Sequence, residues 1–212
     1  MNIKRFENNP FGENTYIIWN QATLEAALVD PGMSNRAEEN VVDRFIADNK
    51  LIVKAILLTH IHIDHTFGVD YARERYGAKV YANRDDEYLG QRRQQQAQMF
   101  HLPVKISPLN IDVFVDEETP LSLGDEKIVP LKAPGHSAGS LLYYVPDSHF
   151  ILTGDVLFQG SIGRTDLPGG DYATLIRSIH AKILELPPTT TIYPGHGPST
   201  TIAEELRYNP YI

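Results

Sequence analysis

The segment Leu58-Thr-His-Ile-His-Ile-Asp-His65 decides what fold and what chemistry this sequence can support. It places three histidines and one aspartate within six positions, directly after an apolar stretch that predicts a buried strand. In an extended segment, His60 and His62 point to the same side because side chains alternate with a period of two. Asp64 and His65 follow at the turn into the next predicted helix, where they can face a second position nearby. Imidazole and carboxylate groups are the donors that zinc and non-haem iron prefer, so this loop can supply two neighbouring ligand sets.

Three later segments each place one more candidate ligand beside a glycine, at the end of an apolar stretch. They are Ala133-Pro-Gly-His136, Leu152-Thr-Gly-Asp155 and Tyr193-Pro-Gly-His196. Glycine lets the backbone turn tightly enough for the ligand to point back towards a metal, and loops at strand ends are the usual place for functional side chains. Any one of these strings alone is more often a turn, but the four segments together predict a metal site. His101, His149 and His180 have no such context, and we interpret them as solvent-exposed or structural.

Hydrophobic periodicity elsewhere predicts a chain in which strands and helices are mixed throughout. Strand patterns cover residues 16–19, 26–29, 53–58, 79–81, 127–132, 141–145, 150–153 and 190–193. Helical patterns cover residues 35–49, 67–76, 84–100, 171–183 and 202–207. Such mixing favours a layered α/β (α+β) arrangement, with sheet inside and helices outside. The pattern alone leaves open whether there is one twisted sheet or two stacked sheets.

Capping signals and apolar faces mark several of these helices. Asn35 with Glu38 three residues on is typical of a capping box, Gly77 ends the second predicted helix, and Asp171 is the expected N-cap of a later one. The apolar face of the first helix should be Val41, Val42, Phe45 and Ile46, and that of the later helix Tyr172, Leu175, Ile176, Ile179 and Ile183.

Composition excludes several classes of protein. The 212 residues are 42% hydrophobic and 22% charged, an ordinary balance for a single globular domain spanning residues 1–212. The formal net charge of −8 argues against a nucleic-acid partner and against docking on an anionic membrane. The absence of cysteine excludes disulfides, thiolate nucleophiles and Cys-ligated zinc. No signal peptide or membrane-spanning run is visible, so we expect a cytoplasmic protein.

The string Thr59-His-x-His-x-Asp-His65, followed by His136, Asp155 and His196, resembles the metallo-β-lactamase fold superfamily over about residues 14–198. The resemblance implies a four-layer αβ/βα sandwich, in which two β-sheets lie face to face with helices on the outer faces and metals at one edge. It also implies a ligand set for two divalent ions. His60, His62 and His136 would bind the first ion, Asp64, His65 and His196 the second, and Asp155 both.

A finer resemblance comes from Gly154-Asp-Val-Leu-Phe158 followed by Gly163-Arg-Thr-Asp166, which is similar to the glyoxalase II group and especially to its short bacterial members. Only 16 residues follow His196, so we expect this chain to lack the helical region with which longer members bind glutathione. The resemblance implies a hydrolase for thioesters such as S-lactoylglutathione. Gly-Arg-Thr-Asp is also found in the related persulfide dioxygenases, which use one iron, and lactonases and esterases share the fold. These activities stay open as alternatives.

Hydrolysis at such a site would use a hydroxide held by the two metal ions, which attacks the thioester carbonyl. Asp64 is the expected catalytic residue, because its carboxylate lies among the ligands and can orient the hydroxide and handle its proton. A thiolate needs little help from a general acid, since a thiol has a pKa of about 8.5. Zinc is the expected metal, although histidine and aspartate donors also suit iron and manganese. Asp30, in Val-Asp-Pro-Gly, is expected to support the site or form a turn rather than bind metal.

Three arginines are candidates for substrate binding. Arg164 could clamp a substrate carboxylate through its planar guanidinium, although an internal pair with Asp166 or Asp171 is slightly favoured because both acids are close in sequence. Arg92 and Arg93 lie in a polar helical pattern that could cover the metal edge and attract an anionic substrate, although most charged helix faces are simply solvated. The expected partner is therefore a small-molecule thioester, and the oligomeric state is left open.

Overall fold

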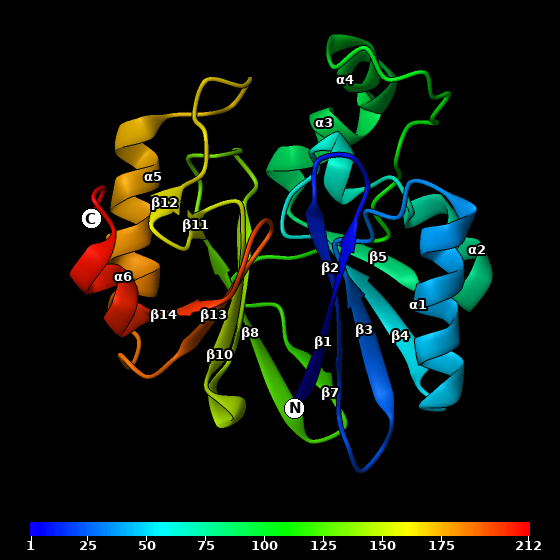
Figure 1. The fold of residues 1–212 in the computed structure, drawn as a ribbon, viewed down its shortest axis with the longest axis horizontal. Helices are drawn as coiled ribbons and strands as arrows, with labels where there is room; N and C mark the ends of the chain where they lie inside the picture. Colours follow the sequence, from blue (N-terminus) through cyan, green and yellow to red (C-terminus); the bar gives the residue numbers. More distant parts are fainter.

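Strand β2 (Glu13–Trp19) shows why the chain folds into two stacked sheets. Tyr16 and Ile18 pack into an apolar cluster between the sheets, whereas Ile17 belongs to a second cluster that includes residues of helix α1 (Arg36–Asp48). Fully burying an isoleucine side chain stabilises a fold by about 1.5–3 kcal/mol, so both faces of this strand must be covered. The computed structural model describes residues 1–212, and Figure 1 shows the result, two sheets face to face with helices outside.

The first sheet has six strands in the order β1-β2-β3-β4-β5-β6. The pairs β1–β2 and β2–β3 are antiparallel, and the three later pairs are parallel. Its other strands are β1 (Asn2–Asn8), β3 (Glu25–Val29), β4 (Ile52–Leu57), β5 (Lys79–Ala82) and β6 (Val113–Phe114). Helices α1 and α2 (Val69–Tyr76) cover its outer face. In such sheets, ligands bind beyond the carboxyl ends of the strands.

The second sheet has six strands in the order β14-β13-β10-β9-β8-β7, of which only β10 and β13 pair in parallel. These strands are β7 (Leu121–Leu123), β8 (Glu126–Lys132), β9 (Leu141–Val145), β10 (Phe150–Gly154), β13 (Thr191–Pro194) and β14 (Thr200–Thr201). Helix α5 (Tyr172–Ser178), its π-helical continuation Ile179–Ile183, and α6 (Ile202–Tyr208) cover the outer face. A small hairpin, β11 (Leu157–Phe158) and β12 (Ser161–Ile162), follows β10.

Two short helices, α3 (Glu87–Gln91) and α4 (Arg93–Met99), lie across one end of the stacked sheets (Figure 1). The 3₁₀ turn Ile63–His65 follows β4 and contacts α4 at the same end. This end of the sandwich is therefore where the first candidate ligands lie. None of the helices combines the length and the hydropathy that crossing a membrane requires.

The predicted four-layer sandwich is confirmed, with corrections to individual elements. The helix predicted over residues 84–100 is interrupted at Arg92, and the polar edge strand β1 has no apolar pattern that could predict it. Val41 and Tyr172, predicted on apolar faces, are 58% and 54% exposed. Residues adjacent in a helix point in different directions, so the core instead takes Val42 with Ile46, one turn apart.

The capping predictions are confirmed except for one partner. The side chain of Asn35 accepts hydrogen bonds from the first turn of α1, and Asp171 caps α5. The Glu38 carboxylate does not return to Asn35; it accepts from the Ser34 N–H (2.7 Å) and the Asn9 N–H (3.1 Å). Because the Asn9 side chain in turn donates to the Asp64 carbonyl oxygen, this cap helps to hold the loop of candidate ligands.

Candidate metal centre

All seven predicted ligands lie together at the end of the sandwich that α3 and α4 cover. Each follows the carboxyl end of a strand, and both sheets contribute: β4 leads to the first loop, β8 to His136, β10 to Asp155 and β13 to His196. Six of them form two groups whose donor atoms lie within 4.8 Å of one another. The groups are His60, His62 and His136, and Asp64, His65 and His196.

The first group consists of three imidazoles. His62 Nδ1 is 2.8 Å from His136 Nε2, which is 3.2 Å from His60 Nε2. Burial and the neighbouring His136 lower the pKa of His62 to about 3, and burial lowers the pKa of His60 well below its usual value. His60 and His62 are therefore neutral rings with lone pairs available. Three ring nitrogens that face one another cannot all be satisfied by hydrogen bonds among themselves, whereas a cation between them satisfies all three.

The second group lies beside the first, and Asp155 faces both. His196 Nε2 is 3.2 Å from Asp64 Oδ2, and His65 Nε2 is 3.8 Å from the same oxygen. Asp155 Oδ1 is 3.3 Å from His65 Nε2, while Asp155 Oδ2 is 3.6 Å from His196 Nε2 and 3.7 Å from His136 Nε2. Burial alone would raise the pKa of Asp155, but the facing His65 and then His196 hold it well below its usual value. An ionised carboxylate therefore stands between the two groups.

Two imidazoles are oriented by hydrogen bonds from their outer nitrogen. His136 Nδ1 donates to the carbonyl oxygen of Arg164 (2.8 Å), and His196 Nδ1 donates to that of Phe11 (3.2 Å). Because Nδ1 faces a carbonyl oxygen in both rings, each ring turns its Nε2 towards the site. This is the arrangement in which outer hydrogen bonds orient metal-binding histidines.

The polar atoms left without partners fit divalent cations. His65 Nε2 and Asp155 Oδ1 are buried and have no hydrogen-bond partner. Leaving such an atom unpaired costs about 1–3 kcal/mol. A Cβ on Gly195 would lie 2.2 Å from Asp155 Oδ1, so only glycine fits beside that carboxylate. Imidazole and carboxylate donors in two groups with one shared carboxylate suit two ions of zinc, iron or manganese.

Two buried carboxylates lie behind His65. Asp30 accepts from the Thr59 N–H (2.7 Å), the Thr59 hydroxyl (2.6 Å) and His65 Nδ1 (3.1 Å), which confirms that it supports the site. Sequence analysis missed Glu13, which is fully buried with Oε1 3.9 Å from His65 Nδ1 and Oε2 accepting from Thr15. Burial raises the pKa of Glu13. A glutamate shortly before the apolar run of residues 16–19 is the signal that could have indicated it.

Asp86, which sequence analysis also missed, joins the two loops that carry the first group. It is fully buried, and its carboxylate accepts from the Ile61 N–H (3.2 Å), the Gly139 N–H (2.7 Å) and the Ser137 hydroxyl (2.7 Å). Ile61 separates the two histidines of the first loop, and Ser137 follows His136. Asp86 therefore sets the distance between the two loops.

We expect Asp86→Ala to reduce stability and turnover together. It leaves buried donors without an acceptor, so the free energy of unfolding should fall by about 3 kcal/mol, and metal-dependent turnover by about 10–100-fold. Urea unfolding and turnover at saturating metal measure the two effects. Asp85→Ala, which removes the exposed neighbouring carboxylate paired with Lys132, is the matched control. Equal behaviour of the two variants would contradict a positioning role for Asp86.

Arg93 is not a substrate-binding residue, contrary to the sequence-based expectation. Its side chain is fully buried, and its guanidinium donates to the carbonyl oxygens of Thr66 and Ser107 and to the Asp70 carboxylate. Thr66 directly follows the first ligand loop, so Arg93, the first residue of α4, holds that loop in place by a hydrogen bond. A polar helical segment therefore contributes a buried cation rather than a solvated one.

The two other candidate arginines and the remaining histidines are exposed. Arg164 lines the pocket over the donors, but it forms a bidentate pair with Asp166, with both N···O distances 2.7 Å. This favours the internal-pair interpretation. Arg92 is exposed and forms no hydrogen bond or ion pair through its side chain within the protein. The three remaining histidines, His101, His149 and His180, are exposed, as expected.

A pocket of about 210 Å³ opens over the candidate ligands. Apart from those ligands, its walls consist of Phe11, Phe100, Leu167 and Arg164. The two phenylalanine rings meet edge to face, with their centroids 5.6 Å apart. The side of the pocket that faces away from the ligands is therefore mostly apolar.

Comparison with known proteins agrees with this geometry. The sequence profile of the metallo-beta-lactamase superfamily matches residues 8–196. The hydroxyacylglutathione hydrolase GloC of Haemophilus influenzae is 37% identical over 219 residues, which cover 100% of this chain and 98% of that protein. The probable metallo-hydrolase YqgX of Bacillus subtilis is 35% identical over 213 residues, with 100% and 98% coverage.

Solved structures show the same fold. The B3 metallo-beta-lactamase BLEG-1 superimposes with a TM-score of 0.90 at 35% identity, covering 99% of each chain. TTHA1623, solved in a di-iron-bound form, gives a TM-score of 0.86 at 34% identity and covers 99% of this chain and 100% of that one. With its two stacked sheets and its histidine-rich site, this chain belongs to the metallo-β-lactamase superfamily of metal-dependent hydrolases.

Proposed function

We propose that this protein is a thioester hydrolase that uses two divalent metal ions and acts on S-lactoylglutathione or a related small-molecule thioester. The pocket over the donors carries this proposal. Outside the candidate ligands its walls are apolar side chains and the paired Arg164, so no side chain there can protonate a leaving group near neutral pH. A thiolate needs no such proton, since its conjugate acid has a pKa of about 8.5. Alkoxides and amines leave far more readily when protonated.

Each group of donors has a role in this proposal. His60, His62 and His136 would hold one ion, Asp64, His65 and His196 the other, and Asp155 both. When bound, the ions would polarise the carbonyl oxygen of the substrate and would lower the pKa of a water molecule. The Asp64 side chain is only 15% exposed, faces the pocket and lies 3.2 Å from His196 Nε2. It can therefore orient an attacking water and accept its proton.

The relatives support this choice of substrate class. GloC, at 37% identity, is named for the hydrolysis of a glutathione thioester. BLEG-1 is named as a β-lactamase, but opening a β-lactam expels an amine nitrogen, which leaves more readily when protonated, and outside the candidate ligands this pocket has no side chain that can protonate it. The di-iron form of TTHA1623 supports iron beside zinc and manganese as the metal.

Asp64→Asn is expected to reduce thioester turnover by about 10²–10⁴-fold, because asparagine keeps the shape of the side chain but cannot accept the proton. His62→Ala should also reduce turnover strongly, by removing a donor of the first group. Thiol release from S-lactoylglutathione measures the activity, and circular dichroism checks the fold. Asp48→Asn and His180→Ala change exposed residues of the same types and are the controls. Unchanged turnover in both Asp64→Asn and His62→Ala would defeat the proposal.

Two further measurements separate this hydrolase from the iron-dependent dioxygenase alternative. Elemental analysis of the purified protein should give two divalent ions per chain. Thiol release from S-lactoylglutathione should proceed without oxygen uptake. Adding glutathione persulfide should cause no oxygen uptake either. One iron per chain together with oxygen uptake on the persulfide would overturn the proposal in favour of the dioxygenase.

A further inference from the structure

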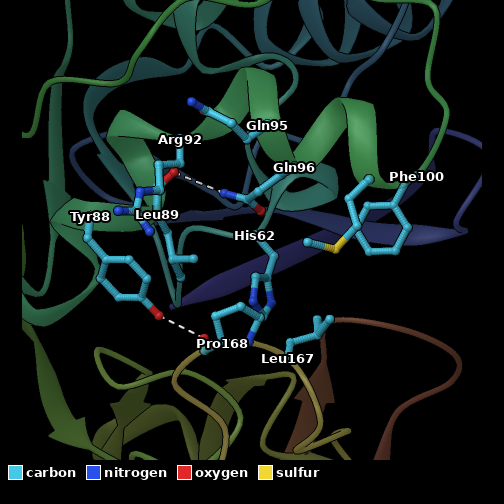
Figure 2. Close-up of a pocket in the computed structure, with 10 residues that line it drawn as sticks. His62, Tyr88, Leu89, Arg92, Gln95, Gln96, Phe100, Leu167 and Pro168 are labelled. Carbon is cyan, nitrogen blue, oxygen red and sulfur yellow. Dashed lines mark hydrogen bonds between the residues drawn. The ribbon is translucent and has the colours of Figure 1, made fainter.

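A second cleft adjoins the pocket over the candidate ligands, and the mechanism above does not use it. Its volume of about 410 Å³ lies within the range of about 300–1,000 Å³ that is typical of ligand-binding clefts. The two cavities share His62, Phe100 and Leu167 as lining residues. Figure 2 shows His62 between helices α3 and α4 on one side and the loop carrying Leu167 and Pro168 on the other. A molecule that reacts at the donors can therefore extend into this cleft.

The walls of the cleft are apolar and already formed. The Tyr88 hydroxyl donates to the Pro168 carbonyl oxygen (2.7 Å), which joins α3 to the opposite loop and leaves the tyrosine ring as a wall. Gln96 donates to the carbonyl oxygens of Leu89 (2.9 Å) and Ile61 (3.2 Å), so its amide group is held in place. No large rearrangement is needed before an apolar chain can enter.

Two exposed side chains line this cleft. Met99 is 54% exposed and presents an apolar side chain to the cleft. Arg92 is the one charged residue that lines the cleft, and its guanidinium has no partner within the protein. Arg164, by contrast, is neutralised by Asp166. The cleft thus combines an apolar surface with a single available cation.

We propose that this cleft binds an apolar arm of the thioester substrate and that Arg92 pairs with a carboxylate at the far end of that arm. The inference rests on the proposed function, because the scissile bond must lie at the neighbouring donors. Glutathione itself is polar and carries an ammonium group and two carboxylates, so it does not match walls of this kind. The apolar arm is therefore an acyl chain, or the chain of another thiol.

Two substrate series distinguish these sources of the apolar arm. One series varies the acyl group on glutathione from acetyl to octanoyl, and the other varies the alkanethiol in acetyl thioesters from ethanethiol to octanethiol. In the series whose variable chain enters the cleft, kcat/KM should rise by about fourfold per methylene group until the cleft is filled. A flat response to chain length in both series would overturn the proposal.

Met99→Gln is expected to flatten the dependence on chain length, because it replaces an apolar wall with a polar one of similar size. Turnover of the shortest thioester should change much less than turnover of the longest. Leu206→Gln makes the same kind of change at an exposed position on α6 and should leave the dependence intact. If Met99→Gln and Leu206→Gln both lower kcat/KM by the same factor for every chain length, the cleft does not contact the variable chain of the substrate.

Arg92→Gln tests the charged end of the cleft. Kcat/KM should fall by about fivefold for an acyl chain that ends in a carboxylate, and should not change for the neutral chain of equal length. Lys105→Gln, at an exposed lysine outside the cleft, is the control. Equal effects of Arg92→Gln on the charged and neutral chains would overturn the role of Arg92.

Binding of thioethers, which cannot be hydrolysed, separates failure of this proposal from failure of the proposed function. S-alkylglutathiones should bind more tightly with each added methylene group in calorimetry, with a negative heat-capacity change, and Met99→Gln should weaken this trend. If no thioester is hydrolysed but the thioethers follow this trend, the proposed function fails and the cleft stands. If thioesters are hydrolysed without any dependence on chain length in turnover or binding, the cleft proposal fails alone.

Discussion

Asp155→Asn should release most of the bound metal and reduce thioester turnover by about 10³-fold. The Asp155 carboxylate is the one group that faces both sets of donors, with oxygens 3.3–3.7 Å from His65, His136 and His196. An asparagine in its place carries one oxygen and an amide that donates hydrogen bonds where the site needs lone pairs. The two ions would lose their shared negative charge, and at most one of them should remain.

Elemental analysis and thiol release measure this result on the same preparation. Asp147→Asn changes an exposed aspartate and should retain two ions and full turnover. The circular dichroism spectrum should match that of the wild type, since the side chain keeps its size. Two ions per chain and unimpaired turnover in Asp155→Asn would contradict a shared carboxylate, and with it the arrangement of the site.

The candidate ligands could be predicted from sequence because each one belongs to a short string at the end of a strand. Strand ends of parallel and stacked sheets gather at a common edge, so local strings were sufficient to name residues that the fold brings together. The alternation within the first loop also predicted that His60 and His62 share a side, and both lie within 3.2 Å of His136 Nε2. The choice between one sheet and two came from the resemblance, because periodicity describes the faces of a strand and not what covers them.

The residues that hold the ligands could not be predicted in the same way, because their partners are distant in sequence. Asp86 and its exposed neighbour Asp85 look alike as sequence, yet only Asp86 reaches the backbone of two ligand loops. For Arg93 the sequence suggested an accessible side chain, since a cation in a polar helix is usually solvated. Its guanidinium instead donates to the carbonyl oxygens of Thr66 and Ser107. Burial of a polar side chain depends on the packing of other elements, which a local pattern does not contain.

Removal of the metal ions is expected to lower the melting temperature by about 10 °C as well as to abolish turnover. A ligand that binds only the folded state, at a free concentration about 1,000-fold above its Kd, stabilises the fold by about 4 kcal/mol, and in a domain of this size each kcal/mol shifts the melting temperature by about 2–4 °C. The direction follows from the site, because without ions the buried His65 Nε2 and Asp155 Oδ1 have no hydrogen-bond partner. Unfolding releases these atoms to water.

Thermal unfolding followed by circular dichroism, with and without a chelator, measures the shift, and elemental analysis confirms that the ions are gone. Adding back zinc, iron or manganese one at a time should restore both stability and turnover, and the extent of recovery identifies the metal that the site prefers. Asp155→Asn is the internal control, since a chain that holds less metal has less stability to lose and should show a smaller shift. A metal-free wild type with an unchanged melting temperature and full turnover would mean that the buried imidazoles and carboxylates are satisfied without cations, and the proposed chemistry would have no basis.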